Sequence, residues 1–293
     1  MTLTRPVFRF APSPNGRLHL GHAYSAFLNA AFARAMDGRL LLRIEDLDPV
    51  RSRPDLVEAM IADLAWLGLR FDPPVLRQSR RIDHYLGAIQ WLAGRGLAYR
   101  CFCSRSSVSA DALASERVTG LPWPKDPDGA SLYPGTCREL APSVIEDRIA
   151  AGLPHTWRLD MEAACRAAPG PHRVEAFGWG EGTTLSVADP ARWGDVVIGR
   201  RDVPASYHLA VVIDDAAQGV THVVRGMDLK AATDIHVLLQ ALLGLDSLCY
   251  HHHALIRDDL GDKLAKSRGS QSLADLRAAG WTTEMIRSRL GYP

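Results

Sequence analysis

The stretch RFAPSPNGRLHLGHA, residues 9–23, decides the fold of this chain. It starts inside a short apolar run at 7–11 and passes through a loop rich in Pro and Gly. It then enters an Ala-rich run with helical character at 20–38. The next run, RLLLRIEDLD at 39–48, reads as an apolar strand. A strand, a helix and a strand in this order form a βαβ unit, which predicts a parallel sheet.

The loop and helix start of this unit form a natural phosphate site. They lie at the carboxyl end of the predicted sheet, where free helix N–H groups and the positive end of the helix dipole attract anions. His19 and His22 are three residues apart, so both imidazoles lie on one face of the helix start. An isolated H-x-x-H pair is more often one core contact and one solvated ring. A zinc protease motif is excluded, because Leu20 and Gly21 stand where that motif needs its Glu.

Composition predicts a folded cytoplasmic protein. The 293 residues are 47% hydrophobic and 23% charged, and the formal charge of +1 excludes a basic protein that coats DNA. The longest strongly apolar stretch, VLLQALLGL at 237–245, is shorter than the roughly 20 residues that span a bilayer. Five cysteines at uneven spacing favour a reducing compartment over a disulfide framework. We therefore expect no membrane association.

The order of patterns along the chain predicts a sheet domain interrupted by an insertion. Sheet-and-helix patterns occupy the first 100 residues and return after residue 195. The stretch between them is rich in Pro and Gly and then alternates like short strands. We expect an α/β fold with four segments. They are the first half of a Rossmann-type parallel-sheet domain, an inserted α+β subdomain, the second half of the sheet domain, and a loop with a short helical segment, at 1–100, 101–195, 196–250 and 251–293.

Two separated motifs resemble the signatures of one enzyme family. HLGH at 19–22 resembles the first signature of the class I aminoacyl-tRNA synthetases, and RFAPSP at 9–14 has the form typical of their glutamyl branch. KLAKS at 263–267 resembles the second signature, Lys-Met-Ser-Lys-Ser, with Ala265 in place of the central Ser. Alone, KLAKS reads as a solvated basic loop. Together, the motifs imply a class I synthetase fold whose sheet domain is split by a zinc-containing insertion.

The resemblance implies that an amino-acid carboxylate attacks the α-phosphate of ATP, which arrives with Mg²⁺. No covalent enzyme nucleophile is needed, because the protein aligns the reactants and neutralises charge on the phosphate oxygens. By resemblance, the catalytic residues are His19, His22 and Lys266. The ATP-binding residues are His19, Gly21, His22, Lys263, Lys266 and Ser267.

The resemblance also implies an amino-acid site that favours glutamate. Glu45 is offered to the substrate ammonium group, and Arg225 to a carboxylate. A buried Arg that binds a carboxylate through two hydrogen bonds rejects the neutral amide. The implied glutamate ligands are Arg9, Ala11, Ser13, Glu45, Tyr207 and Arg225. Taken singly, Glu45 also reads as a solvated strand end and Tyr207 as a core residue.

Three cysteines around the predicted insertion suit structural zinc, which takes four ligands in a tetrahedron. They are Cys101, Cys103 and Cys137. Resemblance to a Cys-x-Cys followed by a Tyr-x-x-x-Cys implies Tyr133 as the fourth ligand. Asp126, Asp128 or water are alternatives, and a cluster of buried cysteines without metal is the competing interpretation.

The end of the sequence bears on the expected acceptor. Ser267 is followed by 26 residues (293 minus 267), so we expect no anticodon-binding domain. In this respect the chain resembles the glutamyl-Q tRNA(Asp) synthetases, which attach activated glutamate to queuosine, the modified wobble base of tRNA(Asp). The resemblance implies L-glutamate, ATP and queuosine-containing tRNA(Asp) as partners, and we expect a monomer. Three alternatives stay open: charging of a tRNA 3′ end, ligation of glutamate to a small amine or carrier protein, and a non-catalytic tRNA-binding paralogue.

Overall fold

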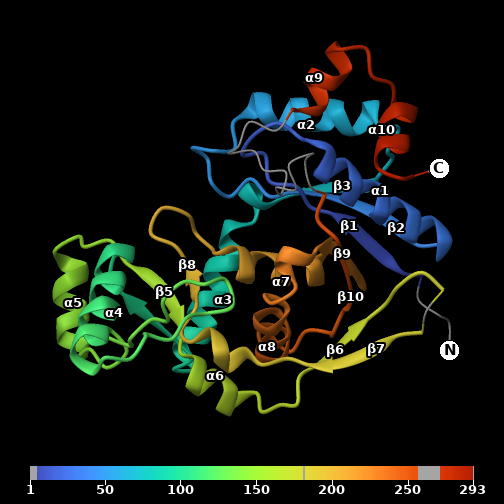
Figure 1. The fold of residues 1–293 in the computed structure, drawn as a ribbon. Coiled ribbons are helices and arrows are strands. Elements are labelled where there is room, and N and C mark those ends of the chain that lie inside the picture. Colours follow the sequence, from blue (N-terminus) through green and yellow to red (C-terminus); the bar gives the residue numbers. More distant parts are fainter. Residues whose placement is uncertain (1–4, 181, 257–270, 293) are drawn as a thin grey trace.

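A seven-stranded sheet forms the centre of the computed structural model, which describes residues 5–180, 182–256 and 271–292 (Figure 1). In the order in which they pair, its strands are β3 (Asp72–Arg77), β2 (Arg39–Ile44), β1 (Val7–Phe10), β9 (His222–Gly226), β10 (Cys249–His253), β6 (Arg173–Ala176) and β7 (Thr184–Val187). Neighbouring strands are parallel except β6 and β7, which are antiparallel. The predicted parallel sheet is confirmed.

Helices cover both faces of this sheet. One face is covered by α1 (Leu20–Ala35), α2 (Pro54–Trp66), α9 (Leu273–Ala278) and α10 (Thr283–Arg289), which share one apolar cluster with Phe10 and Leu42. The other face is covered by α7 (Tyr207–Ala217) and α8 (Thr233–Leu243). Successive residues of β1 alternate between the two faces, as strand geometry requires. Phe8 packs with residues of α1, whereas Arg9 reaches α7.

A second, three-stranded antiparallel sheet forms the core of a small subdomain (Figure 1). Its strands are β4 (Ala98–Cys101), β5 (Thr156–Leu159) and β8 (Val197–Gly199). The accompanying helices are α3 (Ile82–Gly94), which leads into β4, and α4 (Arg105–Thr119), α5 (Pro142–Ala150) and α6 (Met161–Ala167). The α/β class with an insertion is therefore confirmed.

The chain crosses between the two sheets more often than the four predicted segments suggest. Strands β6 and β7 lie within 101–195, yet β6 pairs with β10 and extends the main sheet. Strand order is set by which edge is open to pairing, and sequence patterns do not contain that information. The predicted segment bounds stay predictions.

The described helices include none with the length and apolar character that crossing a bilayer requires.

Candidate active site

A cleft of about 850 Å³ lies at the carboxyl ends of β1, β2, β9 and β10. Ligand sites of parallel α/β sheets occur at this end of the strands. The cleft brings together nine of the twelve predicted catalytic, ATP-binding and glutamate-binding residues: Arg9, Ala11, Ser13, His19, Gly21, His22, Glu45, Tyr207 and Arg225. The other three, Lys263, Lys266 and Ser267, lie outside the described residues.

The two histidines of the HLGH motif cap the first turn of α1. His19 is the N-cap, and its Nδ1 accepts a hydrogen bond of 3.1 Å from the Gly21 N–H. In return, the Nδ1 of His22 accepts one of 3.2 Å from the His19 N–H. Because Nδ1 is an acceptor in both rings, each neutral ring carries its proton on Nε2. The cap thus fixes two imidazoles, with centroids 3.9 Å apart, at the positive end of a helix dipole.

A buried chain of charged side chains links β1 and β2 to α7. Asp215 of α7 accepts hydrogen bonds of 2.9 Å from Arg9 and 2.6 Å from Arg43. Arg43 also donates to Glu45 at 3.3 Å, and Glu45 lies 3.4 Å from the Ser13 hydroxyl. One carboxylate therefore orients two groups of the cleft, Arg9 directly and Glu45 through Arg43.

Burial and the neighbouring guanidinium groups shift the pKa values of Glu45 and Asp215 in opposite directions. Burial raises the pKa of Glu45, and the guanidinium groups of Arg43 and Arg9 offset only part of that effect. Burial also disfavours ionised Asp215, but Arg43 and Arg9 hold the pKa of that carboxyl below its usual value. Asp215 therefore stays charged at neutral pH, and a cationic ligand beside Glu45 favours its ionised form.

Arg225, at the end of β9, is surrounded by neutral groups. Its Nε donates to His252 at 3.2 Å, its Nη1 to His236 at 3.0 Å and its Nη2 to Thr233 at 2.8 Å. Its exposed fraction is 5%, and none of the described carboxylates forms an ion pair with it. Tyr207, whose pKa is raised by burial, lines the same part of the cleft at the start of α7.

The charges around the cleft suit an anionic amino acid. Arg9, Arg43 and Arg225 contribute three positive charges, and ionised Glu45 and Asp215 contribute two negative ones, which leaves +1 among these side chains. A buried charge is stable only when it is paired. A ligand with one ammonium group and two carboxylates carries −1 and completes the balance.

Comparison with known proteins identifies the family to which the chain belongs. A family model described as "tRNA synthetases class I (E and Q), catalytic domain" matches residues 7–291. The chain belongs to this family. It is accordingly a ligase of the class I aminoacyl-tRNA synthetase type, as the sequence motifs predict.

Curated relatives match the synthetase over most of its length. "Glutamyl-Q tRNA(Asp) synthetase" of Rhodobacter capsulatus is 47% identical over 97% of this chain and 99% of that protein. The protein of the same name from Symbiobacterium thermophilum is 40% identical over 97% of this chain and 85% of that protein. "Glutamate--tRNA ligase 2" of Nitrosococcus oceani is 36% identical over 100% of this chain and 60% of that protein.

Solved structures share the fold. A glutamate tRNA ligase from Elizabethkingia meningosepticum, in complex with its amino acid, superimposes with a TM-score of 0.70 at 25% identity over 94% of this chain. The synthetase spans about half of that longer chain, 53%.

Gly21, between the two histidines, leaves room for the His19 ring. A Cβ at this position would lie 3.1 Å from His19 Cε1 and 3.2 Å from its Nδ1. We expect Gly21→Ala to displace the imidazole and lower kcat of ATP–pyrophosphate exchange by about tenfold or more. The thermal midpoint should change little, because the higher helix propensity of Ala opposes the loss of the His19 cap hydrogen bond.

The matched control is Gly87→Ala in α3, where an added Cβ meets nothing within 4 Å. It should leave kcat within about twofold, since exposed helix sites tolerate Ala. Equal kcat in the Gly21 and Gly87 variants would show that the position of the His19 ring does not affect the rate.

The cysteine cluster of the insertion has the spacing of a metal site. The thiol sulfurs of Cys101, Cys103 and Cys137 lie within 4.8 Å of one another. The Tyr133 hydroxyl is 3.5 Å from the Cys103 sulfur and accepts a hydrogen bond of 2.8 Å from the Cys137 N–H. Three thiols with a phenol oxygen beside them fit a tetrahedral zinc ion.

Asp126 and Asp128 do not join this cluster. One Asp126 carboxylate oxygen accepts from the N–H groups of Asp128 and Ala130, at 3.0 and 2.8 Å, and so closes a tight turn. Of the described residues, only the three cysteines form a group spaced for a metal ion. Tyr133 is therefore better placed than either aspartate to be the fourth ligand.

Sequence motifs did not point to several residues that orient the predicted ligands. These are Arg43, Asp215, Thr233 and His236, together with His252, which belongs to the run of three histidines at 251–253 whose role the sequence leaves unassigned. A signal for Arg43 exists, since a charge inside the apolar strand RLLLRI requires a buried partner. The partner lies 172 residues away, and no local pattern identifies it.

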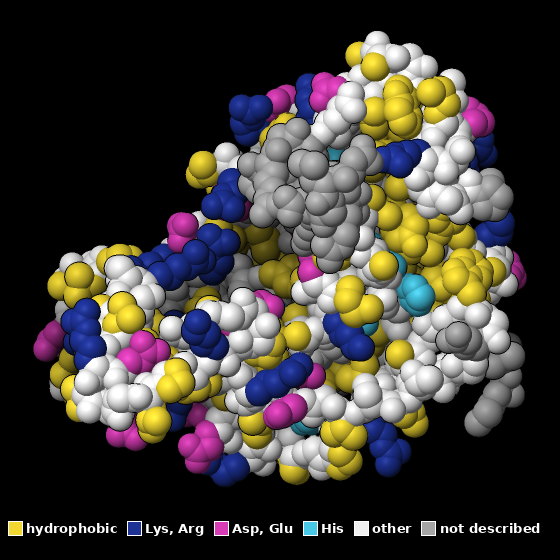
Figure 2. Space-filling model, in the orientation of Figure 1, with side chains coloured by type: hydrophobic (Ala, Val, Ile, Leu, Met, Phe, Trp, Pro, Cys, Tyr) yellow, Lys and Arg dark blue, Asp and Glu magenta, His cyan; other side chains and the backbone are white. Residues whose placement is uncertain are grey.

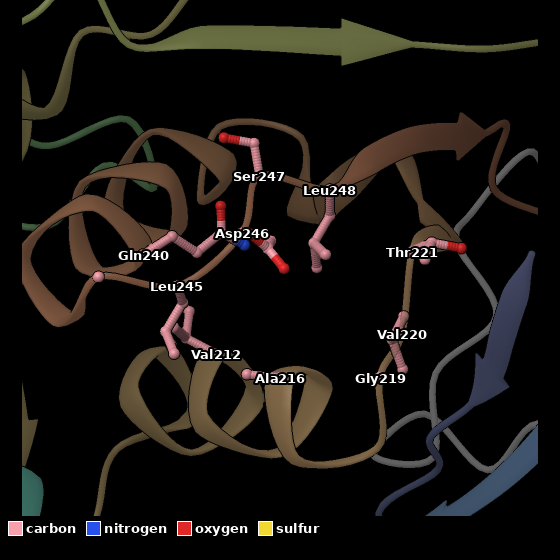
Figure 3. A pocket seen from close by; sticks show the side chains of 11 residues that line it. Val212, Ala216, Gly219, Val220, Thr221, Gln240, Leu245, Asp246, Ser247 and Leu248 are labelled. Atoms are coloured by element: carbon pink, nitrogen blue, oxygen red, sulfur yellow. The ribbon is translucent and has the colours of Figure 1, made fainter. Parts of the chain in front are cut away.

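A smaller cavity of about 280 Å³ lies at the opposite, amino ends of β9 and β10, between α7 and α8 (Figure 3). Val212 of α7 and Gln240 of α8 line it together with the loop Asp246, Ser247 and Leu248. It contains none of the predicted site residues. Gln240 also donates a hydrogen bond of 3.1 Å to the Tyr250 hydroxyl. The Tyr250 ring lies against the Arg225 guanidinium, so this hydrogen bond helps to hold the ring beside Arg225.

Proposed function

We propose that this synthetase activates L-glutamate with ATP and transfers it to the queuosine base of tRNA(Asp). The glutamate α-carboxylate attacks the α-phosphorus of ATP, and the bond from that phosphorus to the bridging oxygen breaks to release pyrophosphate. A queuosine hydroxyl then attacks the acyl carbon of glutamyl-adenylate and loses its proton, and AMP leaves. Both steps are acyl or nucleotidyl transfers that need alignment and charge neutralisation.

The observation that carries the glutamate assignment is the buried Arg225 without a carboxylate partner among the described residues. Its guanidinium is proposed to bind the side-chain carboxylate, and Glu45 the ammonium group. His19 and His22, whose Nδ1 atoms accept backbone hydrogen bonds, are proposed to donate from Nε2 to the phosphates, with Mg²⁺ arriving on ATP. Lys263, Lys266 and Ser267 keep their proposed ATP roles on the strength of the KLAKS motif alone.

The queuosine assignment is supported by the names of the relatives. Several curated relatives at 38–47% identity are named glutamyl-Q tRNA(Asp) synthetases. The surface is consistent with an RNA partner, since Figure 2 shows Lys and Arg side chains beside the hollow between the small subdomain and the sheet domain. Exposed arginines of the sequence include Arg80, Arg105 and Arg201. Such groups contact phosphates without reading bases.

The test is transfer of radiolabelled glutamate, with ATP, to two tRNA pools that differ only in queuosine. One pool comes from queuosine-replete cells and the other from queuosine-deficient cells. A third sample is the replete pool after removal of its 3′-terminal adenosine, which leaves the wobble base intact. We expect label on the replete pool, equal label after removal of the adenosine, and none on the deficient pool.

Other outcomes contradict the proposal in different ways. Equal label on both pools that is lost with the terminal adenosine would mean charging of a 3′ end. Pyrophosphate exchange without label on any tRNA would point to a small amine or a carrier protein as acceptor. Absence of exchange with any amino acid would favour a non-catalytic tRNA-binding protein.

We also propose that Cys101, Cys103, Cys137 and Tyr133 hold one structural zinc ion. The ion would join the end of β4 to the loop at 133–137 and has no role in the reaction. We expect about one zinc per chain in purified protein, and Cys103→Ser should lower both the zinc content and the thermal midpoint. Elemental analysis and thermal unfolding measure these two quantities.

The matched control for this site is Cys165→Ser in α6, outside the cluster. It should keep the zinc content of the unmodified chain. Zinc-free protein with an unchanged thermal midpoint after chelation would contradict a structural metal. The monomeric state, the cytoplasmic location and the four segment bounds remain predictions from sequence.

A further inference from the structure

We propose that Thr233 and His236 of α8 are positioning residues that make Arg225 selective for a carboxylate over a carboxamide. The inference rests on the proposed function, because it assumes that Arg225 binds the side-chain carboxylate of the amino acid. It adds that the selectivity depends on a cradle of uncharged acceptors around the guanidinium. We call Thr233, His236 and His252 the Arg225 cradle.

The Arg225 cradle accepts hydrogen bonds from some, but not all, of the N–H donors of the guanidinium. An arginine side chain has five N–H donors. Three are taken by the cradle, at 3.2 Å to His252, 3.0 Å to His236 and 2.8 Å to Thr233. Five minus three leaves two donors, the number that a carboxylate accepts in a bidentate pair.

The hydrogen bonds from Arg225 set the tautomers of His236 and His252, because a guanidinium can only donate. His236 accepts from Arg225 on Nδ1, so its proton is on Nε2 and points to the His208 Nδ1, 3.3 Å away. His252 accepts on Nε2 from Arg225, and the Thr233 hydroxyl, 3.3 Å away, donates to the same atom. Each of these rings therefore works as a neutral acceptor toward its neighbour.

Burial keeps the three rings neutral. It lowers the pKa of His208 to about 4 and that of His252 to about 3, and the charge of Arg225 adds to both shifts. Burial, again with Arg225, holds the pKa of His236 well below its usual value. The cradle thus accepts hydrogen bonds without cancelling the positive charge that it orients.

Neutral acceptors and an acidic partner would have opposite effects on selectivity. An Asp or Glu beside Arg225 would neutralise it and compete with a ligand carboxylate. With neutral acceptors, the buried positive charge of Arg225 is compensated only when an anion binds. A carboxamide offers no charge and leaves part of the desolvation cost unrecovered. The contrast lies within this cleft, since Arg9 is paired with Asp215 and Arg225 is not paired with a described carboxylate.

The experiment uses the full chain with Thr233→Val and His236→Leu, each of which replaces an acceptor by an apolar side chain of similar size. Glutamate affinity is measured by calorimetry, and KM and kcat for glutamate and glutamine by ATP–pyrophosphate exchange. We expect each variant to weaken glutamate binding and raise KM for glutamate by about tenfold or more. The kcat and the KM for ATP should change less than about twofold, and the preference for glutamate over glutamine should fall.

Two further variants separate positioning from simple loss of stability. His236→Asn, whose amide oxygen replaces the Nδ1 acceptor, should restore most of the glutamate affinity. Thr283→Val removes a hydroxyl that donates to the Trp66 carbonyl at 2.9 Å, outside the cleft, and should leave KM for glutamate unchanged. Its thermal midpoint gives the structural cost of losing one such bond.

The outcomes distinguish this inference from the proposed function. If the unmodified chain binds glutamate and the Thr233 and His236 variants bind it equally well, the cradle has no positioning role. If all affinities fall in proportion to the thermal midpoint and His236→Asn restores nothing, the role is structural only. If the unmodified chain binds no acidic amino acid, the proposed function fails first and the inference fails with it.

Discussion

Arg225→Gln will lower kcat/KM for glutamate in ATP–pyrophosphate exchange by at least about a hundredfold, because removing one partner of a buried charge pair costs about 3–5 kcal/mol. The side chain is 5% exposed, so water cannot replace it at the ligand carboxylate. The variant keeps hydrogen-bond donors but has no charge. Its remaining preference for glutamate over glutamine should be small.

Arg225→Lys tests whether charge alone is enough. Lys supplies a point charge without the planar fork, so it cannot satisfy three cradle acceptors and a bidentate carboxylate together. We expect its kcat/KM to remain at least about tenfold below that of the unmodified chain. The control is Arg166→Gln on α6, where the side chain is 66% exposed and pairs with Glu162. Full activity of Arg225→Gln would show that Arg225 does not bind the glutamate side chain.

Asp215→Asn will destabilise the fold by about 3–5 kcal/mol at pH 7, because it removes the charged partner of buried Arg9 and leaves buried Arg43 with Glu45 alone. Chemical denaturation followed by circular dichroism measures the free energy of unfolding. Glutamate affinity should also fall, since Asp215 orients Arg9 directly and Glu45 through Arg43. The control is Asp37→Asn, whose carboxylate is 95% exposed in its pair with Arg5 and should matter by less than about 0.5 kcal/mol.

The difference in unfolding free energy between the unmodified chain and Asp215→Asn should become smaller in acid. The pKa of Asp215 is lower in the folded chain than in the unfolded chain, where an Asp titrates near pH 4. Its contribution is therefore complete above about pH 4 and is lost as the pH falls through the folded value. The stability gap between the unmodified chain and Asp215→Asn should narrow as the pH falls below about 4. A gap that widens in acid would contradict the assignment.

Local patterns were enough to predict the first βαβ unit and the helix start that caps on His19 and His22. The strand and helix periods can be read within a few residues, and a parallel pair requires its loop at the carboxyl end. The nine described residues that were assigned to the active site by resemblance converge in one cleft. Their roles depend on the proposed function, whereas their proximity is a property of the fold.

The three consecutive histidines show where local reasoning stops. Alternation along a strand means that 251–253 cannot all face one way. The structure assigns the faces: His252 points to Arg225 and Thr233, whereas His251 and His253 contact Phe32 and Tyr24 of α1. Only the position of β10 between β9 and β6 gives these faces their different surroundings.

The amino-acid sequence was enough for the α/β class, the family and nine of the residues that line the cleft, because these depend on periodicity and on short motifs. The tertiary structure alone decided which groups hold those residues in place. Asp215 meets Arg9 and Arg43 across 206 and 172 positions, and the Arg225 cradle joins β9, α8 and β10. Such partners are chosen by packing of the sheet against its helices, and a buried charge finds its counterpart through space rather than along the chain.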